Sequence, residues 1–401
     1  MLNYQDLLDA CSRGGASVLT SVTEMEPAAG PHASVAPAKF VERSNSVFAF
    51  ETRYIDGEPQ TIALLDSKQS SLNRAEQAIQ QDIDAGFAPI SQVPRIVVDY
   101  GEGGQLTDME LPHRFADGHI RAGTIDGEPA TKNDSYRAVR NSTQGNITAL
   151  VQTAPAAAVF GGWDSTRATN QLRLPSALVG EVIGVLADQD ATGEEQQSKR
   201  GGARVDSLAM SVKLTGPQMK ELLDAQREEL SPTKVGEIEK KIKSEKKGTI
   251  SASSLGLGGI PPKLESLGGV SCKRIIRTWV LSFAALRQLR FGGSYEQDVA
   301  GRALLAAFGL AAMARAEEEN YLRANCHLVE KSAPQVILDQ RHGESKEFSA
   351  LTVKEADKLL ATAIEEARKL GVVDWSGQVL EVQGNPIVLG GAVEEAEDEQ
   401  K

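Results

Sequence analysis

The sequence predicts an α+β protein, and three observations lead to that class. Residues 47–55 alternate between apolar and polar side chains, residues 56–59 have turn composition, and residues 60–65 return as a second strand, so a hairpin is expected. Residues 72–83 place Leu, Ala and Ile side chains on one helical face. Residues 299–316 have the composition of a buried, alanine-rich helix. Locally paired strands combined with long helices are typical of the α+β class.

The other elements of the first half follow from shorter patterns. The helix at 72–83 has Ser67 available as a cap one turn earlier, and Gly86 ends it. The remaining predictions are, in chain order, a short helix at 4–10, loop to residue 46, a strand at 92–100 and a short helix at 135–141.

The second half of the chain alternates strands, helices and polar segments. Thr352 and Glu355 form a capping box for a last helix that runs to Leu370 and that Gly371 ends. The other predictions are a small-residue strand at 154–160, a helix at 175–186, a polar loop at 188–202, a strand at 203–214, an amphipathic helix at 216–230, and paired strands at 321–330 and 335–339.

One domain with insertions, residues 1–390, is expected to hold these elements. Residues 231–269 have weak core-forming character, because a lysine-rich run precedes a glycine-rich stretch, and they predict a mobile basic insertion. Residues 391–401 predict a disordered acidic tail. The pentapeptide Ile-Asp-Gly-Glu-Pro occurs at 55–59 and again at 125–129, which predicts two similar loops.

Charge is distributed unevenly along the 401 residues, which carry a formal net charge of −12. Residues 1–130 have 9 basic and 19 acidic side chains, residues 131–291 have 23 and 16, and residues 292–401 have 11 and 20. Exposed charges act over roughly 8 Å at physiological salt, so local charge decides contact. The basic middle third is therefore the part of the chain suited to a polyanionic partner.

Composition also limits the cellular setting. The three cysteines lie far apart and form no C-x-x-C pair, which excludes a disulfide framework and a zinc ribbon. The N-terminus lacks a basic segment followed by an apolar one, and the longest apolar run, 303–314, is too short to cross a bilayer. We therefore expect a soluble cytoplasmic protein without membrane contact.

Enzyme signatures are missing from the sequence. The glycine-rich stretches at 101–104 and 256–259 lack the third glycine of a dinucleotide-binding loop, and no G-x-x-x-x-G-K motif occurs. The five histidines show no metal-ligand spacing. Residues 292–296 depart from the nucleophile-elbow pattern because position 296 is glutamate. No cofactor, metal or catalytic residue is expected.

Two segments carry more information than these patterns. Residues 66–76 have the sequence DSKQSSLNRAE, and residues 158–167 have the sequence AVFGGWDSTR. The first resembles the S-x-Q-S-x-x-N-R-x-E helix opening, and the second the VFG-x-WDST segment, of the backbone RAMP subunit of type I-G (formerly I-U) CRISPR effector complexes. Further landmarks that resemble this family follow in the same order at 174–183, 204–206 and 321–326. We call residues 66–76 and 158–167 the first and second landmark segments.

The resemblance implies an RRM-like (ferredoxin-like) palm, in which helices back an antiparallel sheet, with finger and thumb insertions. It implies a non-enzymatic subunit that polymerises with copies of itself as a helical filament along CRISPR RNA (crRNA), beside other CRISPR effector subunits. The guide would then read target DNA by base pairing while the protein holds the RNA backbone. Two alternatives stay open: a metal-dependent endoribonuclease of the RAMP group, and a structural protein that polymerises without RNA.

The first landmark segment supplies one set of candidates for RNA contact. The side chains concerned, together with backbone N–H groups at the helix start, could converge on a phosphate. These side chains are Ser67, Lys68, Gln69, Ser70, Asn73 and Arg74. The alternative is ordinary helix capping with a solvated face.

The second landmark segment and the basic middle third supply the other candidates. Trp163 is either a base-stacking platform or a core anchor, and Asp164 is either a turn cap or, in an endoribonuclease, a metal ligand. The lysine run at 234–247 is either a solvated segment or a flexible arm that touches nucleic acid. The remaining RNA-binding candidates are Ser165, Thr166, Arg167, Arg137, Arg140, Arg204, Lys273 and Arg274.

Overall fold

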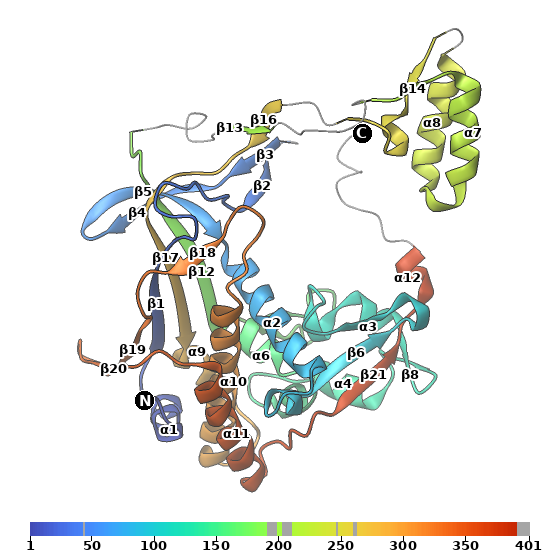
Figure 1. Ribbon diagram of the computed structural model, residues 1–401. Coiled ribbons are helices and arrows are strands. Elements are labelled where there is room, and N and C mark those ends of the chain that lie inside the picture. The colour runs from blue at the N-terminus through green and yellow to red at the C-terminus, as the bar shows by residue number, and fades with distance from the viewer. Residues whose placement is uncertain (43–44, 191–198, 203–210, 246–247, 260–262, 391–401) are drawn as a thin grey trace. The chain divides into compact units, whose positions relative to one another are not determined.

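The computed structural model describes residues 1–42, 45–190, 199–202, 211–245, 248–259 and 263–390. The chain divides into two compact units, one made of Met1–Ala191 with Val270–Lys401 and the other of Thr192–Gly269. The larger unit combines antiparallel sheet with helices (Figure 1), so the predicted α+β class is confirmed.

A large antiparallel sheet forms the centre of the larger unit. Its strands follow the order β20-β19-β1-β17-β12-β5-β4, and β18 also pairs with β1. Every pairing along this path is antiparallel. The strands are β1 (Val18–Pro27), β4 (Phe50–Ile55), β5 (Glu58–Asp66), β12 (Leu178–Leu186), β17 (Cys272–Ser282), β18 (Leu328–Glu330), β19 (Gln335–Asp339) and β20 (Ser345–Phe348).

The predicted hairpin is confirmed as β4 and β5. Asp56 and Gly57 at its turn have φ values of 53° and 84°, as a two-residue type I′ turn requires. Asp126 and Gly127 repeat this geometry, with φ values of 52° and 79°, so the two similar loops are confirmed. The strands on either side of the Asp126–Gly127 turn are β8 (Thr124–Ile125) and β9 (Glu128–Pro129), and β2 (Lys39–Glu42) and β3 (Asn45–Phe48) form a separate two-stranded sheet.

Strand β1 corrects the loop expected up to residue 46. Its buried face carries Ser21 and Thr23 between Leu19 and Met25, so the apolar alternation that would reveal a strand is absent. The strand forms because β17 pairs along one edge and β18 and β19 pair along the other. Strand formation that depends on neighbours rather than on local propensity is common in sheets.

The structures expected for 154–160 and 175–186 are both wrong. The first segment contains helix α6 (Ala156–Phe160), and its run of small apolar residues is buried on all sides. The second contains β12, which lies between β5 and β17 and is mostly buried on both faces. Apolar runs without alternation do not distinguish a buried strand from a buried helix, which explains why a helix was predicted as a strand and a strand as a helix.

The strands expected to pair with each other at 321–330 and 335–339 instead pair separately with β1. β18 pairs with the end of β1 at Met25–Pro27, and β19 pairs with its beginning at Leu19–Val22. β1 is ten residues long and so has room for both partners along one edge.

Helices cover one face of the large sheet (Figure 1). Ser67 caps α2 by accepting a hydrogen bond from the Ser70 N–H at 3.2 Å, and the capping box of Thr352 and Glu355 starts α11 as predicted. α10 has the length and composition of a membrane span, but 94% of its apolar window is buried inside the structure, as in the core helix of a folded domain. The helices are α1 (Tyr4–Cys11), α2 (Lys68–Asp84), α9 (Phe283–Leu286), α10 (Tyr295–Glu319) and α11 (Val353–Lys369).

A second sheet, of order β7-β6-β21-β8-β9, also belongs to the larger unit. It confirms the strand predicted at 92–100, and α4 confirms the helix predicted at 135–141. The elements here are β6 (Arg95–Asp99), β7 (Gln105–Thr107), α3 (Gly118–Ala122), α4 (Asp134–Arg140), α5 (Thr148–Thr153), β10 (Gly162–Trp163), β11 (Arg173–Leu174), β21 (Val379–Gln383) and α12 (Pro386–Gly390).

The smaller unit has its own core, which corrects the weak core-forming character expected at 231–269. Met219 and Leu223 of one helix pack with Ile238 of the next and with Ile250 and Leu255. Residues 199–202, expected as polar loop, form a strand paired with 263–267. The elements are β13 (Lys199–Gly202), β14 (Lys213–Leu214), α7 (Gly216–Gln226), α8 (Pro232–Ser244), β15 (Ile250–Ser251) and β16 (Lys263–Leu267).

Several expectations fall wholly or partly outside the described residues. They are the polar loop at 188–202, of which residues 191–198 are not described, the strand at 203–214, of which residues 203–210 are not described, parts of the basic insertion at 231–269 and of the lysine run at 234–247, and the acidic tail at 391–401.

Candidate nucleic-acid interface

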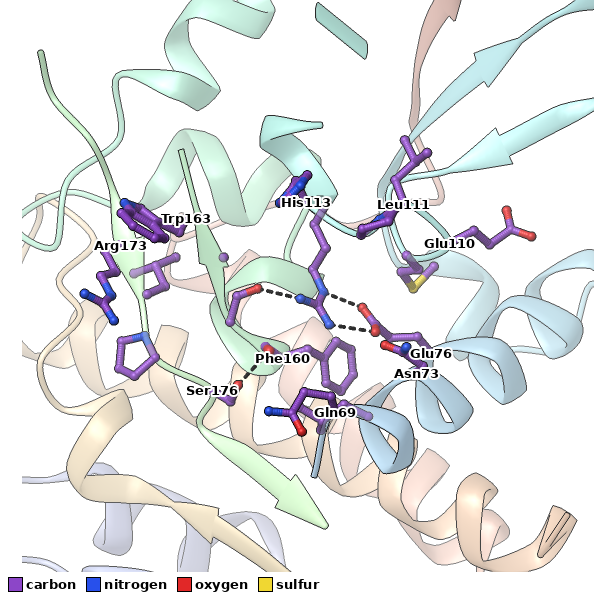
Figure 2. A pocket seen from close by; sticks show the side chains of 18 of the residues that line it. Gln69, Asn73, Glu76, Glu110, Leu111, His113, Phe160, Trp163, Arg173 and Ser176 are labelled. Carbon is purple, nitrogen blue, oxygen red and sulfur yellow. Dashed lines mark hydrogen bonds and ion pairs between the residues drawn. The ribbon is translucent and has the colours of Figure 1, made fainter. Parts of the chain in front are cut away.

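A groove of about 920 Å³ lies between helix α2 and the hairpin formed by β10 and β11 (Figure 2). Residues of the first landmark segment line one wall, and Phe160 to Trp163 of the second landmark segment line the other. Gln77, residues 109–114 and residues 173–176 complete the lining. The fold therefore brings together two segments that are far apart in the sequence.

The wall supplied by α2 carries a row of carboxamides. Gln69, Asn73 and Gln77 are spaced four residues apart, so they share one face of the helix. All three are exposed, and among the described residues none of their side chains has a hydrogen-bond partner. We call these three residues the carboxamide row.

The hydroxyl groups at the start of α2 are used inside the protein. Ser67 accepts the capping hydrogen bond from Ser70, and the Ser70 hydroxyl accepts one from Arg74 Nη2 at 3.3 Å. Lys68, by contrast, is exposed and makes no ion pair within the described ranges. Of the residues predicted to form a phosphate cradle, Lys68 and the carboxamides are the ones available to a ligand.

Arg74 is held by an internal ion pair. Its Nε lies 3.2 Å from Asp66 Oδ2, and Arg323 Nη2 reaches Oδ1 of the same carboxylate at 2.8 Å. Ser71 donates a further hydrogen bond to Asp66 at 2.9 Å. Asp66 is buried, so Arg74 and Arg323 neutralise a carboxylate that water cannot solvate.

The floor of the groove is a second internal ion pair. Arg114 Nε and Nη2 donate to the two Glu76 carboxylate oxygens at 2.6 and 2.7 Å, and Arg114 Nη1 donates to the Gly161 carbonyl at 3.0 Å. Glu76 is 1% exposed. Through Arg114, this pair connects α2 to the second landmark segment, and the charges of Glu76 and Arg114 neutralise each other.

Trp163 lies at the opposite wall and is 49% exposed, which rules out a role as a core anchor. It pairs across the hairpin with Arg173, whose guanidinium carbon lies 5.1 Å from the centre of the indole ring. Arg173 is exposed and makes no ion pair in the described part of the chain. An exposed indole with an unpaired cation beside it is typical of surfaces that stack nucleobases.

Asp164, next to Trp163, faces inward. Arg140 binds both of its carboxylate oxygens, with Nε to Oδ2 at 2.9 Å and Nη2 to Oδ1 at 3.0 Å, and the Asp164 side chain is fully buried. Arg140 is therefore a structural partner of Asp164 and is not free to bind phosphate. Among the described residues, no group of three or more His, Cys, Asp or Glu side chains is arranged to hold a metal ion.

The other predicted residues of the second landmark segment support the loop between β10 and β11. Arg167 donates to the Arg140 carbonyl and to Asn141 Oδ1, and so closes the loop onto the end of α4. Thr166 accepts a hydrogen bond from Arg121 at 2.7 Å. Ser165 is exposed, and its carbonyl accepts a hydrogen bond from Gln171 at 3.2 Å.

The remaining predicted residues do not line the groove. Arg137 is exposed on α4, with a contact of 3.5 Å to Asp134. Lys273 and Arg274 are neighbours on β17; Lys273 donates to Gln60 at 2.7 Å, and Arg274 pairs with Asp56 at 3.0 Å. Arg204 lies outside the described residues.

Sequence reasoning missed three groove residues: Gln77, Arg114 and Arg173. Gln77 had a usable signal, because it continues the spacing of Gln69 and Asn73 by one helical turn. Arg114 and Arg173 had none, because their positions depend on pairing with Glu76 and Trp163 across the fold.

The buried carboxyl group of Asp108 should make the stability of the protein depend on pH. This carboxyl group is buried and accepts a hydrogen bond from the Ile96 N–H at 2.9 Å, but Oδ2 has no partner among the described residues. Burial raises the pKa of Asp108 from 3.8 to about 7. Because this pKa is higher in the folded chain, the free energy of unfolding falls as the pH rises from 3.8 to about 7.

We expect Asp108→Asn to melt at a higher temperature than the wild type at about pH 8 and at the same temperature at about pH 4. The amide keeps the acceptor for Ile96 but removes the charge, a gain on the order of 2–4 kcal/mol above the pKa. Calorimetry of both proteins at the two pH values measures this difference. An equal gain at both pH values would contradict the assignment to ionisation.

Comparison with known proteins gives one family match, which covers the groove. Residues 19–189 match the family model described as CRISPR-associated protein GSU0053 (Cas_GSU0053), a span that includes both landmark segments and every residue lining the groove. A search of curated proteins finds no match. Residues 19–189 are therefore similar to a CRISPR-associated protein family.

Proposed function

We propose that this protein is the crRNA-binding backbone subunit of a type I CRISPR surveillance complex. The observation that carries the proposal is the convergence of both landmark segments on one groove, with Trp163 exposed in its wall. The subunit would polymerise along the guide in the cytoplasm, contact other effector subunits, and leave the spacer free to pair with target DNA.

The order of the central strands supports an RRM-like palm. Read in chain order, β1, β12, β17 and β19 form the antiparallel arrangement fourth-first-third-second. Helix α2 lies in the connection from β1 to β12, and helix α10 lies in the connection from β17 to β19. A ferredoxin-like motif has the order β-α-β-β-α-β, so this arrangement supports an RRM-like palm with insertions in its connections.

The chemistry of the groove supports a binding role without catalysis. Three charged groups in or next to the landmark segments, Glu76, Arg114 and Asp164, are each engaged by a neighbour within the protein. A general base or metal ligand needs a lone pair that substrate or metal can reach. We therefore propose that this protein holds RNA without cutting it.

Copurification with RNA tests the proposal. We expect the full chain, produced together with a CRISPR array, to carry RNA that shows a high ratio of absorbance at 260 nm to that at 280 nm and that contains guide sequence. In titrations of the stripped protein with single-stranded RNA, the plot of log affinity against log salt should have a slope of about −3 to −4, from four to six phosphate contacts. Protein that is free of nucleic acid, together with a slope near zero, would refute the proposal.

A further inference from the structure

The groove between α2 and the β10–β11 hairpin is not built for phosphate. Of the ionised side chains in its lining, Glu76 and Arg114 neutralise each other, and Glu110 accepts a hydrogen bond from the Thr107 N–H at 2.8 Å. Arg173 is the remaining cation, and its guanidinium lies over the indole of Trp163. A groove with balanced charge lacks the excess of cations that attracts a polyanion.

The groove instead offers the two kinds of contact that recognise a nucleobase. The carboxamide row provides donors and acceptors side by side, which suits the polar edge of a base. Trp163 provides an aromatic surface, half exposed and held in place by its pairing with Arg173. The apolar side chains of Leu72 and Leu174 also line the groove.

We propose that this groove holds an unstacked nucleobase of a bound single-stranded RNA, with its face on Trp163 and its polar edge on the carboxamide row. The volume of about 920 Å³ falls within the range of sites for small organic ligands. Phosphates would be bound outside the groove, where Lys68 is exposed beside Gln69. This inference rests on the proposed function, because it specifies how the same RNA is held.

Intrinsic fluorescence can report on the site directly. The chain has three tryptophans, and Trp279 and Trp375 are buried while Trp163 is exposed. Stacking of a base on Trp163 should therefore quench part of the emission when RNA is added, and Trp163→Phe should abolish that quenching while keeping an aromatic ring for binding.

The decisive experiment compares ordinary single-stranded RNA with an abasic strand of the same length. We expect Trp163→Ala and the double variant Asn73→Ala with Gln77→Ala each to weaken binding of ordinary RNA by roughly 5- to 150-fold. Neither variant should change binding of the abasic strand or the salt slope. Lys68→Ala should weaken binding of both strands and make the slope of log affinity against log salt shallower by about 0.7.

Gln81→Ala is the matched control, since Gln81 is an exposed carboxamide one turn further along α2 but does not line the groove. Equal loss of affinity for both strands in the groove variants would mean that the groove holds backbone, which overturns the inference. Unchanged affinity in the groove variants would exclude RNA from the groove, as expected for a site that binds peptide, and would leave the proposed function standing. Failure of the wild type to bind any RNA would refute both.

Discussion

We expect Asp164→Ala to lower the free energy of unfolding by about 3–5 kcal/mol, because it leaves the Arg140 guanidinium buried without a counter-ion. The Arg140 side chain is 11% exposed, and the Asp164 side chain is 0% exposed. Chemical denaturation followed by circular dichroism measures the loss. Asp134→Ala is the control, because Asp134 pairs with Arg137 on the surface of the same short helix, and this variant should leave stability unchanged.

A second variant of this residue, Asp164→Asn, distinguishes the binding protein from the endoribonuclease that the sequence left open. Both oxygens of the buried Asp164 carboxylate face the Arg140 guanidinium, so a metal ion would have to displace Arg140 to reach them, and Mg²⁺ or Mn²⁺ should not alter the melting temperature of the wild type. Stabilisation by metal that Asp164→Asn abolishes, together with cleavage of complementary RNA, would favour the nuclease.

We expect Asp66→Ala to be comparably damaging, with a loss of about 3–5 kcal/mol in the free energy of unfolding. Asp66 is 0% exposed and is the shared partner of Arg74, Arg323 and Ser71, so its removal leaves two cations facing a buried site. Equilibrium denaturation in urea measures this loss. Glu365→Ala removes an exposed ion pair with Lys369 and should have no measurable effect.

This ion pair also changes what should be expected of Arg74. Because Arg74 is an ion-pair partner of Asp66, Arg74→Ala should lower the melting temperature. Lys68→Ala should instead lower RNA affinity and leave the melting temperature unchanged. A normal melting temperature for Arg74→Ala combined with weaker RNA binding would return Arg74 to the phosphate contacts predicted from the sequence.

Local patterns were sufficient where short-range physics decides the structure. The hairpin turn at Asp56 and Gly57 follows from residues that tolerate positive φ, and the start of α2 follows from the Ser67 cap. The capping box at Thr352 and Glu355 is a third case. In each, the interacting groups lie within four residues of one another, so the sequence displays the whole interaction.

Local sequence patterns failed to predict elements whose structure depends on contacts with distant parts of the chain. Serine and threonine on the buried face of β1 hide a central strand that exists because its neighbours pair with it. The mostly buried β12 is an apolar run without alternation, which does not distinguish a strand from a helix. The small core of the unit at 192–269 was missed for the same reason, because it depends on contacts between Met219, Ile238 and Ile250 across that unit.

The sequence by itself determined that this chain is an α+β protein with two landmark segments similar to a CRISPR-associated family, a relationship that residues 19–189 bear out. Only the tertiary structure decided which landmark side chains remain available to a ligand. Arg74 and Arg140 are bound by the buried carboxylates Asp66 and Asp164, while Trp163 stays exposed. The physical reason is that a buried carboxylate must be neutralised, and the cation that neutralises it is chosen by distance in the fold.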